Sequence, residues 1–230
     1  MQKSINGAAF RKMVLAGVSL LEQNKEYIDS LNVFPVPDGD TGTNMFLTMK
    51  SAMGEINKCM NNDLASLSEA FSKGALRGAR GNSGVITSQI FKGFCSVTKN
   101  CKELSTKDFA KAMQEGATIA YKAVTKPKEG TILTVIRVMA ENAVNLAKKH
   151  DDFEVFLKKV IDTGEEILKQ TPEMLPVLKK AGVVDSGGRG ILVIFTGFYR
   201  FIIGDEDLEI TFEDDTKPQT VDDVIADISK

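Results

Sequence analysis

A short acidic loop holds the residues of this sequence whose types and spacing are best suited to chemistry. Asp38 and Asp40 are separated by one glycine, and a run of small residues follows them: Thr41, Gly42, Thr43 and Asn44. Carboxylate oxygens two positions apart suit Mg²⁺, which proteins bind through one or two carboxylates together with substrate phosphates. The run begins a predicted helix, whose N-terminal N–H groups attract anions. The loop therefore predicts a site for phosphate and a divalent cation, although an acidic turn that only caps the helix would have the same pattern.

Three more loops combine glycine with short hydrogen-bonding side chains, at residues 78–84, 126–131 and 184–190. Their candidate phosphate-binding residues are Gly81, Asn82, Ser83, Gly84, Gly130, Thr131, Asp185, Ser186 and Gly187. Arg80 is a candidate catalytic residue because a guanidinium can clamp phosphate, although it could also cap the preceding helix. Each loop taken alone is equally typical of a tight turn, and none matches a Walker A loop or a Rossmann fingerprint.

Helical periodicity dominates the chain that must position these loops. Apolar residues recur at steps of three and four from Phe10 onward. The same pattern predicts further long helices at about residues 43–60, 64–76, 83–97, 107–123, 131–147, 153–168 and 187–203, with a short one near 175–180. We therefore expect an all-α fold with eight long helices.

The order of these helices predicts where the four loops lie. The acidic loop and the three glycine-rich loops precede the second, fourth, sixth and eighth long helices. Alternate connections of an up-and-down bundle lie at the same end. We therefore expect the four loops to converge on one end of the bundle and form a single anion site, which unrelated turns would not do.

Composition argues against several other classes of function. The chain has 230 residues, 43% of them hydrophobic, and a net charge of −2 without a run of Lys or Arg, so we expect no nucleic-acid partner. Its three cysteines form no CxxC pair, which indicates a reduced, cytoplasmic protein. The single histidine, His150, leaves little material for a His-based metal site or a catalytic triad. No signal peptide is visible, and the most apolar stretch, 190–203, is too short to span a membrane, so we expect a buried core helix there.

The acidic segment at residues 205–230 differs from the rest of the chain. It carries Pro218 and a short alternating run at 208–212 that predicts a strand. We expect residues 1–204 to form one domain, and residues 205–230 to be a linker or the start of a following domain.

The string at residues 32–45 resembles the metal-binding loop in the nucleotide-binding, DhaL-like domain of dihydroxyacetone kinases. Residues 81–84, 130–131 and 185–188 resemble the later nucleotide-contacting loops of that family, in the same order. Residues 171–174 resemble the stretch beside the nucleotide base, which makes Pro172 a candidate contact, although a plain proline turn would look the same. The resemblance covers about residues 5–204. It implies an eight-helix antiparallel bundle or barrel with Mg²⁺ and ATP or ADP at one end.

One branch of this family resembles the chain more closely. Residues 31–45, with 78–84, 129–135 and 182–188, resemble the N-terminal domain of the ATP-binding subunit of bacterial fatty acid kinases. This implies transfer of the γ-phosphate of ATP to a fatty acid carboxylate, presented by a separate DegV-type lipid-binding protein, to give an acyl phosphate. It also implies a longer protein, with a possible homodimer formed through domains absent here. A dihydroxyacetone-type kinase subunit and a non-catalytic nucleotide-sensing module are the alternatives.

One position departs from the pattern of dihydroxyacetone kinases, which carry a third aspartate five residues before the pair. That position is Val33 here, with Asn32 beside it. We predict that Asn32 supplies the third metal ligand through its amide oxygen, with water as the alternative. The predicted metal ligands are therefore Asp38, Asp40 and Asn32.

Overall fold

The structure, a computed structural model, describes residues 1–205. Within this part of the chain it contains nine α-helices and no strand. The helices are α1 (Gly7–Ser30), α2 (Thr41–Lys58), α3 (Leu64–Gly78), α4 (Gly81–Thr98), α5 (Thr106–Ala123), α6 (Ile132–Ala147), α7 (Phe153–Met174), α8 (Pro176–Ala181) and α9 (Ser186–Ile203). This confirms the prediction of eight long helices and one short one. The strand predicted at 208–212 and the predicted linker, apart from its first residue, lie outside the described residues.

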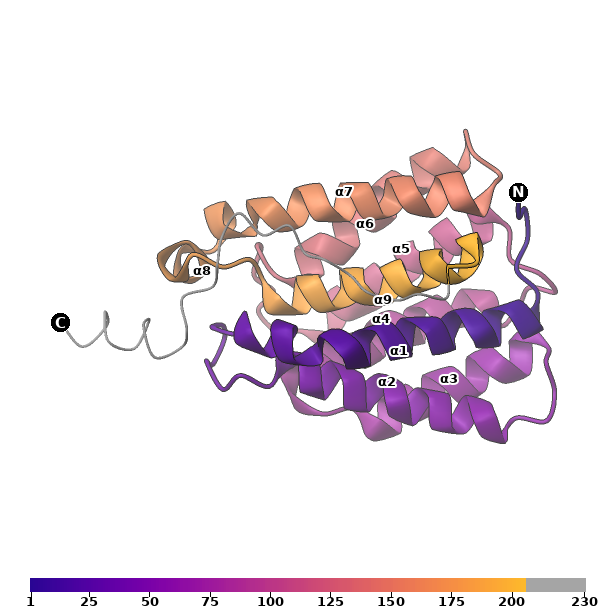
Figure 1. The fold of residues 1–230 in the computed structure, drawn as a ribbon, viewed down its shortest axis with the longest axis horizontal. Coiled ribbons are helices and arrows are strands. Elements are labelled where there is room, and N and C mark those ends of the chain that lie inside the picture. Colours follow the sequence, from indigo (N-terminus) through magenta and orange to yellow (C-terminus); the bar gives the residue numbers. More distant parts are fainter. Residues whose placement is uncertain (206–230) are drawn as a thin grey trace.

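The eight long helices form a closed antiparallel bundle (Figure 1). Each long helix packs against its neighbour along the chain, and α9 packs against α1, which closes the ring. The short α8 connects α7 to α9. The predicted all-α, eight-helix antiparallel architecture is therefore confirmed.

Figure 1 separates two ends of this bundle. We call the end at which α2, α4, α6 and α9 begin the loop end, because the acidic loop and the three glycine-rich loops lie there. The other end, at which α1, α3, α5 and α7 begin, is the far end. The predicted convergence of the four loops on one end is confirmed.

Each of the four helices that begin at the far end is capped by its own N-cap side chain. The four caps are Asn6 to the Ala9 amide, Asp63 to Ser66, Ser105 to Asp108 and Asp152 to Glu154. Ser105 and Asp108 form a reciprocal capping box. The N-terminal segment is tied to the same end, since Ile5 pairs with Leu104 through two backbone hydrogen bonds of 2.9 Å.

Phenylalanine rings fill much of the bundle interior. A chain of ring contacts runs through Phe10, Phe71, Phe91, Phe94, Phe109, Phe153, Phe156, Phe195 and Phe198, with centroids 4.9–6.4 Å apart. The apolar stretch at 190–203 forms most of α9, whose first ten residues are all buried, so the predicted core helix is confirmed. Glycine lets α9 approach α1 closely, because a Cβ on Gly197 would lie 2.5 Å from the Cα of Gly17. Among the described helices, none has the length and apolarity to cross a membrane.

The seventh long helix runs further than its periodicity predicted. It continues past Leu168 to Met174 with Pro172 in its last turn. Proline has no N–H to donate to the carbonyl four residues earlier. That carbonyl, on Leu168, instead accepts a hydrogen bond of 2.7 Å from the Thr171 hydroxyl. The side chain therefore compensates for the missing donor, and the helix can include the proline.

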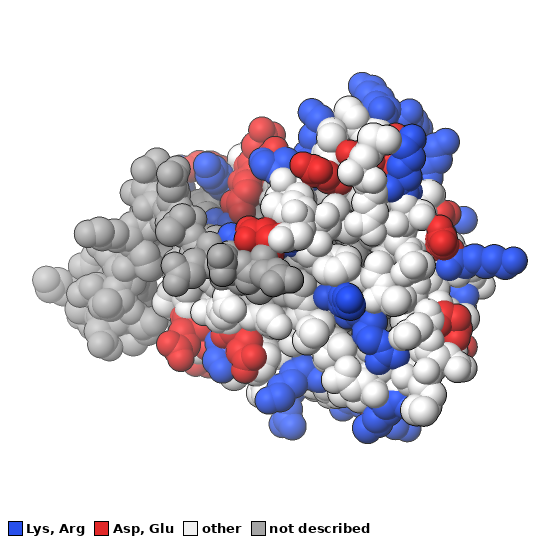
Figure 2. Space-filling model, turned by 45° about the vertical axis from the view of Figure 1, so that its right-hand side comes forward, with Lys and Arg blue, Asp and Glu red and all other residues white. Residues whose placement is uncertain are grey.

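Charged side chains lie mainly around the margin of the face shown in Figure 2. Lys and Arg also lie near the middle of this face, among uncharged residues, and they are interspersed with Asp and Glu at its edge. The chemistry on which the sequence analysis focused lies instead at the loop end of the bundle.

Candidate functional site

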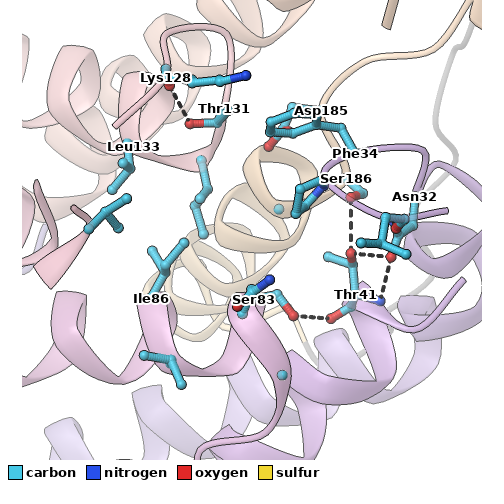
Figure 3. A pocket seen from close by; sticks show the side chains of 18 of the residues that line it. Asn32, Phe34, Thr41, Ser83, Ile86, Lys128, Thr131, Leu133, Asp185 and Ser186 are labelled. Atoms are coloured by element: carbon cyan, nitrogen blue, oxygen red, sulfur yellow. Dashed lines mark hydrogen bonds between the residues drawn. The ribbon is translucent and has the colours of Figure 1, made fainter. Parts of the chain in front are cut away.

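Residues from all four loops line one cavity of about 830 Å³ at the loop end (Figure 3). The predicted site residues that line it are Asn32, Asp38, Asp40, Thr41, Gly81, Asn82, Ser83, Thr131, Asp185, Ser186 and Gly187. The predicted residues that do not line it are Gly42, Thr43, Asn44, Arg80, Gly84, Gly130 and Pro172. The sequence therefore located the cavity, but it included several residues that support its walls.

Asn32 organises the acidic loop from a buried position. Its amide oxygen accepts hydrogen bonds from the Asp40 amide (3.3 Å), the Thr41 amide (3.2 Å) and the Thr41 hydroxyl (2.6 Å). Its amide nitrogen donates to the Val36 carbonyl at 2.8 Å. These bonds already use the oxygen that a metal would need. These bonds make Asn32 the residue that shapes the loop, and its role as a metal ligand stays a prediction.

The first turn of α2 is largely occupied by protein groups. Asp29, on α1, accepts from both the amide (3.0 Å) and the hydroxyl (2.6 Å) of Thr43. Gly42 faces α1, where a Cβ would lie 2.2 Å from the Lys25 carbonyl oxygen. The Asn44 amide donates to the Asp40 carbonyl at 2.8 Å. These contacts anchor α2, and Thr41 is the member of the run that lines the cavity, while the expectation that the run holds phosphate stays a prediction.

Asp38 and Asp40 lie close together at the cavity wall. Partial desolvation, together with the hydrogen bond and negative charge of Asp40, raises the pKa of the Asp38 carboxyl above its ordinary value. Within residues 1–205, neither carboxylate forms an ion pair with Lys or Arg. Two adjacent carboxylates without a cationic partner fit a divalent cation, which would remove their repulsion. Within residues 1–205, no group of three or more His, Cys, Asp or Glu side chains is placed to hold a metal ion.

The first turn of α4 presents open amides to the cavity. Arg80 occupies the N-cap position but its side chain makes no capping hydrogen bond. The first helical bond is made by the Gly84 amide, so the preceding amides of Gly81, Asn82 and Ser83 have no acceptor within the described structure. Gly81 has a φ of 59°, and a Cβ there would lie 2.4 Å from the Asn44 side chain. The turn therefore requires glycine at the point where the amides turn toward the cavity.

Asp185 holds the starts of α6 and α9 together from a buried position. Its carboxylate caps α9 by accepting from the Gly188 amide at 2.7 Å. Burial raises its pKa to about 6, while hydrogen bonds from the Gly188 and Ile132 amides act in the opposite direction. Asp185 therefore serves the architecture of two helix N-termini as well as lining the cavity.

Hydroxyl groups link three of the helix starts across the floor of the cavity (Figure 3). Ser186, at the start of α9, donates to the Thr41 hydroxyl at 3.1 Å. Ser83, at the start of α4, donates to the Thr41 carbonyl at 3.2 Å. Thr41 therefore joins α2 to α4 and α9, and all three residues line the cavity.

The third loop contributes Thr131 to the cavity, whereas Gly130 and Pro172 lie behind it. Gly130 has a φ of 83°, and a Cβ there would lie 2.9 Å from that of Met174 and 3.0 Å from the Thr171 carbonyl oxygen. The end of α7, which carries Pro172, therefore supports the loop from outside the cavity.

Sequence reasoning missed two kinds of residue that line the cavity. One is an apolar wall formed by Phe34, Val85, Ile86, Val124 and Leu133. The other is a pair of lysines on the third loop, Lys126 and Lys128, which from the sequence alone resemble ordinary surface lysines. The signal that could have identified them is their position in the loop between the predicted helices at 107–123 and 131–147, which is one of the four loops expected to converge. Arg80, by contrast, is exposed outside the lining.

Curated bacterial proteins are similar to this chain in sequence. Protein YloV of Bacillus subtilis is 49% identical over 203 residues, which cover 88% of this chain and 37% of that protein. An uncharacterized protein of Staphylococcus aureus is 47% identical over 206 residues, covering 90% of this chain and 38% of that protein. The chain therefore spans somewhat more than a third of the length of these relatives.

Two solved structures of the dihydroxyacetone kinase of C. freundii share the fold. The native form has a TM-score of 0.61 at 16% identity, and the complex with AMP-PNP and Mg²⁺ has 0.63 at 15%. Each match covers 87% of this chain and 35% of the kinase. At the level of sequence, the DAK2 domain matches residues 35–200, most of the described bundle, and the chain belongs to this family.

Proposed function

We propose that this chain is the Mg-ATP-binding domain of a kinase. The observation that carries the proposal is the single cavity at which an unpaired aspartate pair meets the open helix start of α4 and the hydroxyls of α2, α6 and α9. Helix N-termini bind phosphate, and carboxylates bind the accompanying Mg²⁺. The same fold in a kinase solved with AMP-PNP and Mg²⁺ supports this assignment.

The residues divide the work of binding between them. Asp38 and Asp40 would hold Mg²⁺, which neutralises phosphate charge when it is bound. The amides of residues 81–83 would hold the phosphates. The hydroxyls of Ser83, Ser186 and Thr131 donate to the Thr41 carbonyl, the Thr41 hydroxyl and the Lys128 carbonyl, so they would shape the wall beside the phosphates. Asn32 holds the acidic loop in the shape that keeps the two carboxylates together. The apolar wall offers a surface for the nucleotide base.

We propose a fatty acid carboxylate as the phosphate acceptor. Among the described residues that line the cavity, the only carboxylates are the proposed metal ligands and the buried cap Asp185, and the single histidine of the chain is not one of them. A carboxylate acceptor is already ionised at neutral pH and needs no general base, so positioning and charge neutralisation suffice to form an acyl phosphate. The acceptor would be presented by a DegV-type lipid-binding partner at the open mouth of the cavity.

The division of the chain follows from this proposal. Residues 1–204 would be the nucleotide-binding domain, and residues 205–230 would lead into the remainder of a longer protein, as the coverage of the relatives suggests. The domain alone would bind nucleotide without transferring phosphate.

A dihydroxyacetone-type kinase subunit is the second candidate, because the solved structures that share the fold are dihydroxyacetone kinases. Its acceptor is a ketose hydroxyl, which requires a base from a partner. A nucleotide-sensing module would bind Mg-ATP without transferring phosphate.

Calorimetry with and without Mg²⁺, followed by an assay of phosphate transfer, tests the proposal. We expect Mg-dependent ATP binding, and phosphate transfer from ATP to a lipid-loaded DegV-type protein once the full-length chain is used. Transfer to free dihydroxyacetone with its own partner subunit would favour the second candidate. A folded chain that does not bind ATP would overturn the assignment.

A further inference from the structure

The third loop, residues 126–131, places two cationic side chains at the cavity. Among the described lining residues, Lys126 and Lys128 are the cationic ones, and Asp38 and Asp40 lie in the same lining on the acidic loop. The Lys128 ammonium lies 5.3 Å from the centroid of the Phe34 ring, which belongs to the acidic loop. Lys128 therefore reaches from the third loop toward the first, and Figure 3 shows both residues among those that line the cavity.

The Lys128 ammonium is not neutralised by its neighbouring carboxylate. Glu129 accepts hydrogen bonds from Tyr121 at 2.9 Å, Thr134 at 2.7 Å and Arg137 at 2.8 Å. These partners lie on α5 and α6, so the Glu129 carboxylate binds these two helices and forms no ion pair with Lys128. Lys128 forms no ion pair within residues 1–205 and rests instead on an aromatic face, a weaker partner for a cation than a carboxylate or phosphate.

The backbone that carries Lys128 is fixed. The Thr131 hydroxyl donates to the Lys128 carbonyl at 2.8 Å, and the Gly130 amide donates to the Thr134 hydroxyl at 2.9 Å. Together with Glu129, these bonds hold the loop on the start of α6. These hydrogen bonds fix the backbone position of Lys128 at the cavity. Its flexible four-carbon side chain still allows the ammonium to move.

We propose that Lys128 binds the terminal phosphate of ATP, taking the charge-neutralising role that the sequence suggested for Arg80. This inference rests on the proposed Mg-ATP site. Phe34 lies four residues before Asp38 on the same loop, so an ammonium on its ring is next to the loop that carries the proposed metal ligands. When a triphosphate binds, the ammonium exchanges the ring for the γ-phosphate. A diphosphate lacks that partner, so Lys128 favours ATP over ADP.

The test compares Mg-ATP and Mg-ADP binding by calorimetry for the wild type and Lys128→Met. A hydrogen bond to a charged group contributes about 1.5–3 kcal/mol, so we expect Mg-ATP binding to weaken about ten- to a hundredfold and Mg-ADP binding to change less than about threefold. Lys128→Arg should keep most of the preference for ATP. Lys122→Met is the matched control, because Lys122 is an exposed lysine six residues earlier and outside this cavity. Melting temperatures of all variants check that each one folds.

Three results would overturn the inference. Lys128→Met could keep the wild-type ratio of ATP to ADP affinity, or weaken both nucleotides equally, or match the effect of Lys122→Met. In each case the wild type still binds Mg-ATP and the proposed function stands. A wild-type chain that binds neither nucleotide would overturn the proposed function and the inference together.

Discussion

The two ends of the bundle differ in whether their helix N-termini are capped by side chains. At the far end, α1, α3, α5 and α7 each begin with a side chain that accepts a hydrogen bond from the first turn. At the loop end, α2, α4 and α6 begin without such a bond, and α9 alone is capped, by Asp185. A cap satisfies amides that are otherwise left for water or a ligand. The far end therefore contributes stability. At the loop end the start of α4 keeps donors available for a ligand, whereas Asn32 and Asp29 occupy the start of α2 and Asp185 accepts from those of α6 and α9.

Four carboxylates show a related difference between the ends, although Glu129 in the third loop is an exception: partial desolvation is outweighed there by hydrogen bonds from Thr134, Arg137 and Tyr121, and its pKa is lowered. At the far end, hydrogen bonds from Ser66 lower the pKa of Asp63, and the Lys3 ammonium lowers that of Asp151. At the loop end, the pKa values of Asp38 and Asp185 are raised. A carboxylate whose pKa is raised by folding opposes the folded state when it is ionised. Such local costs are typical of functional sites.

The largest expected effect is the loss of the aspartate pair. Asp38→Asn/Asp40→Asn should weaken Mg-dependent ATP binding at least about a thousandfold, because even outer partners of metal ligands are worth 10–100-fold each. The melting temperature should not fall, since the substitution removes repulsion between the carboxylates. Calorimetry and thermal unfolding measure both effects, with Asp151→Asn as the far-end control. A double variant that binds Mg-ATP as tightly as the wild type would show that Asp38 and Asp40 do not bind the metal.

The pH dependence of stability should reveal Asp185. Its pKa rises from an ordinary 3.8 to about 6 in the folded protein, so the folded state binds this proton more tightly than the unfolded state. The free energy of unfolding should therefore fall by up to about 3 kcal/mol as the pH rises from 4 to 6, and this group should add no further change above that. Urea unfolding of the wild type and Asp185→Asn across this range measures the difference. Parallel curves for the two proteins would contradict the assignment.

Removing a far-end cap should cost stability and leave the site unchanged. Ser105→Ala removes the hydroxyl of the capping box and should lower the free energy of unfolding by about 1–2 kcal/mol. Mg-ATP affinity should stay within about twofold of the wild type, a difference of about 0.4 kcal/mol. Urea unfolding and calorimetry on the same samples give both values. A large loss of affinity would show that the two ends are not separable.

Adding a cap at the loop end should have the smallest effect on stability, with the opposite sign. Arg80→Asn places a short acceptor at the open N-cap of α4 and should raise the free energy of unfolding by about 0.5–1 kcal/mol relative to Arg80→Ala. The asparagine would occupy amides of residues 82 and 83, so Mg-ATP should bind more weakly than it does to Arg80→Ala. If the cap stabilises the protein without weakening nucleotide binding, the open amides do not serve phosphate.

Helix number and loop placement could be predicted because they depend on local pattern. Steps of three and four identify a helix from its own residues, and the parity of the helices then places the four loops at one end. The core role of α9 followed from the same pattern. The spacing of apolar residues sufficed for these features, because the burial of apolar surface drives the packing of helices.

The roles of individual loop residues depended on partners distant in sequence. Thr43 is held by Asp29, 14 residues away, and Ser186 meets Thr41 from 145 residues away. Asn32 looked like a metal ligand, but its oxygen is used by the loop that it organises. Lys128 has no signal in its own segment, because a lysine between a proline and a glutamate is typical of any exposed turn. No local rule predicts such contacts.

Amide chemical shifts in an NMR titration with Mg-AMP-PNP test the difference between the two ends most directly. The account predicts that the largest shifts fall at residues 81–83, together with 131–133 and 186–187, and that the capped turns at 7–9, 64–66 and 106–108 stay unchanged. Removing Mg²⁺ should weaken the response and abolish the shifts around Asp38 and Asp40. Shifts of equal size at both ends, or none at the start of α4, would contradict the claim that the uncapped helix starts form the nucleotide site.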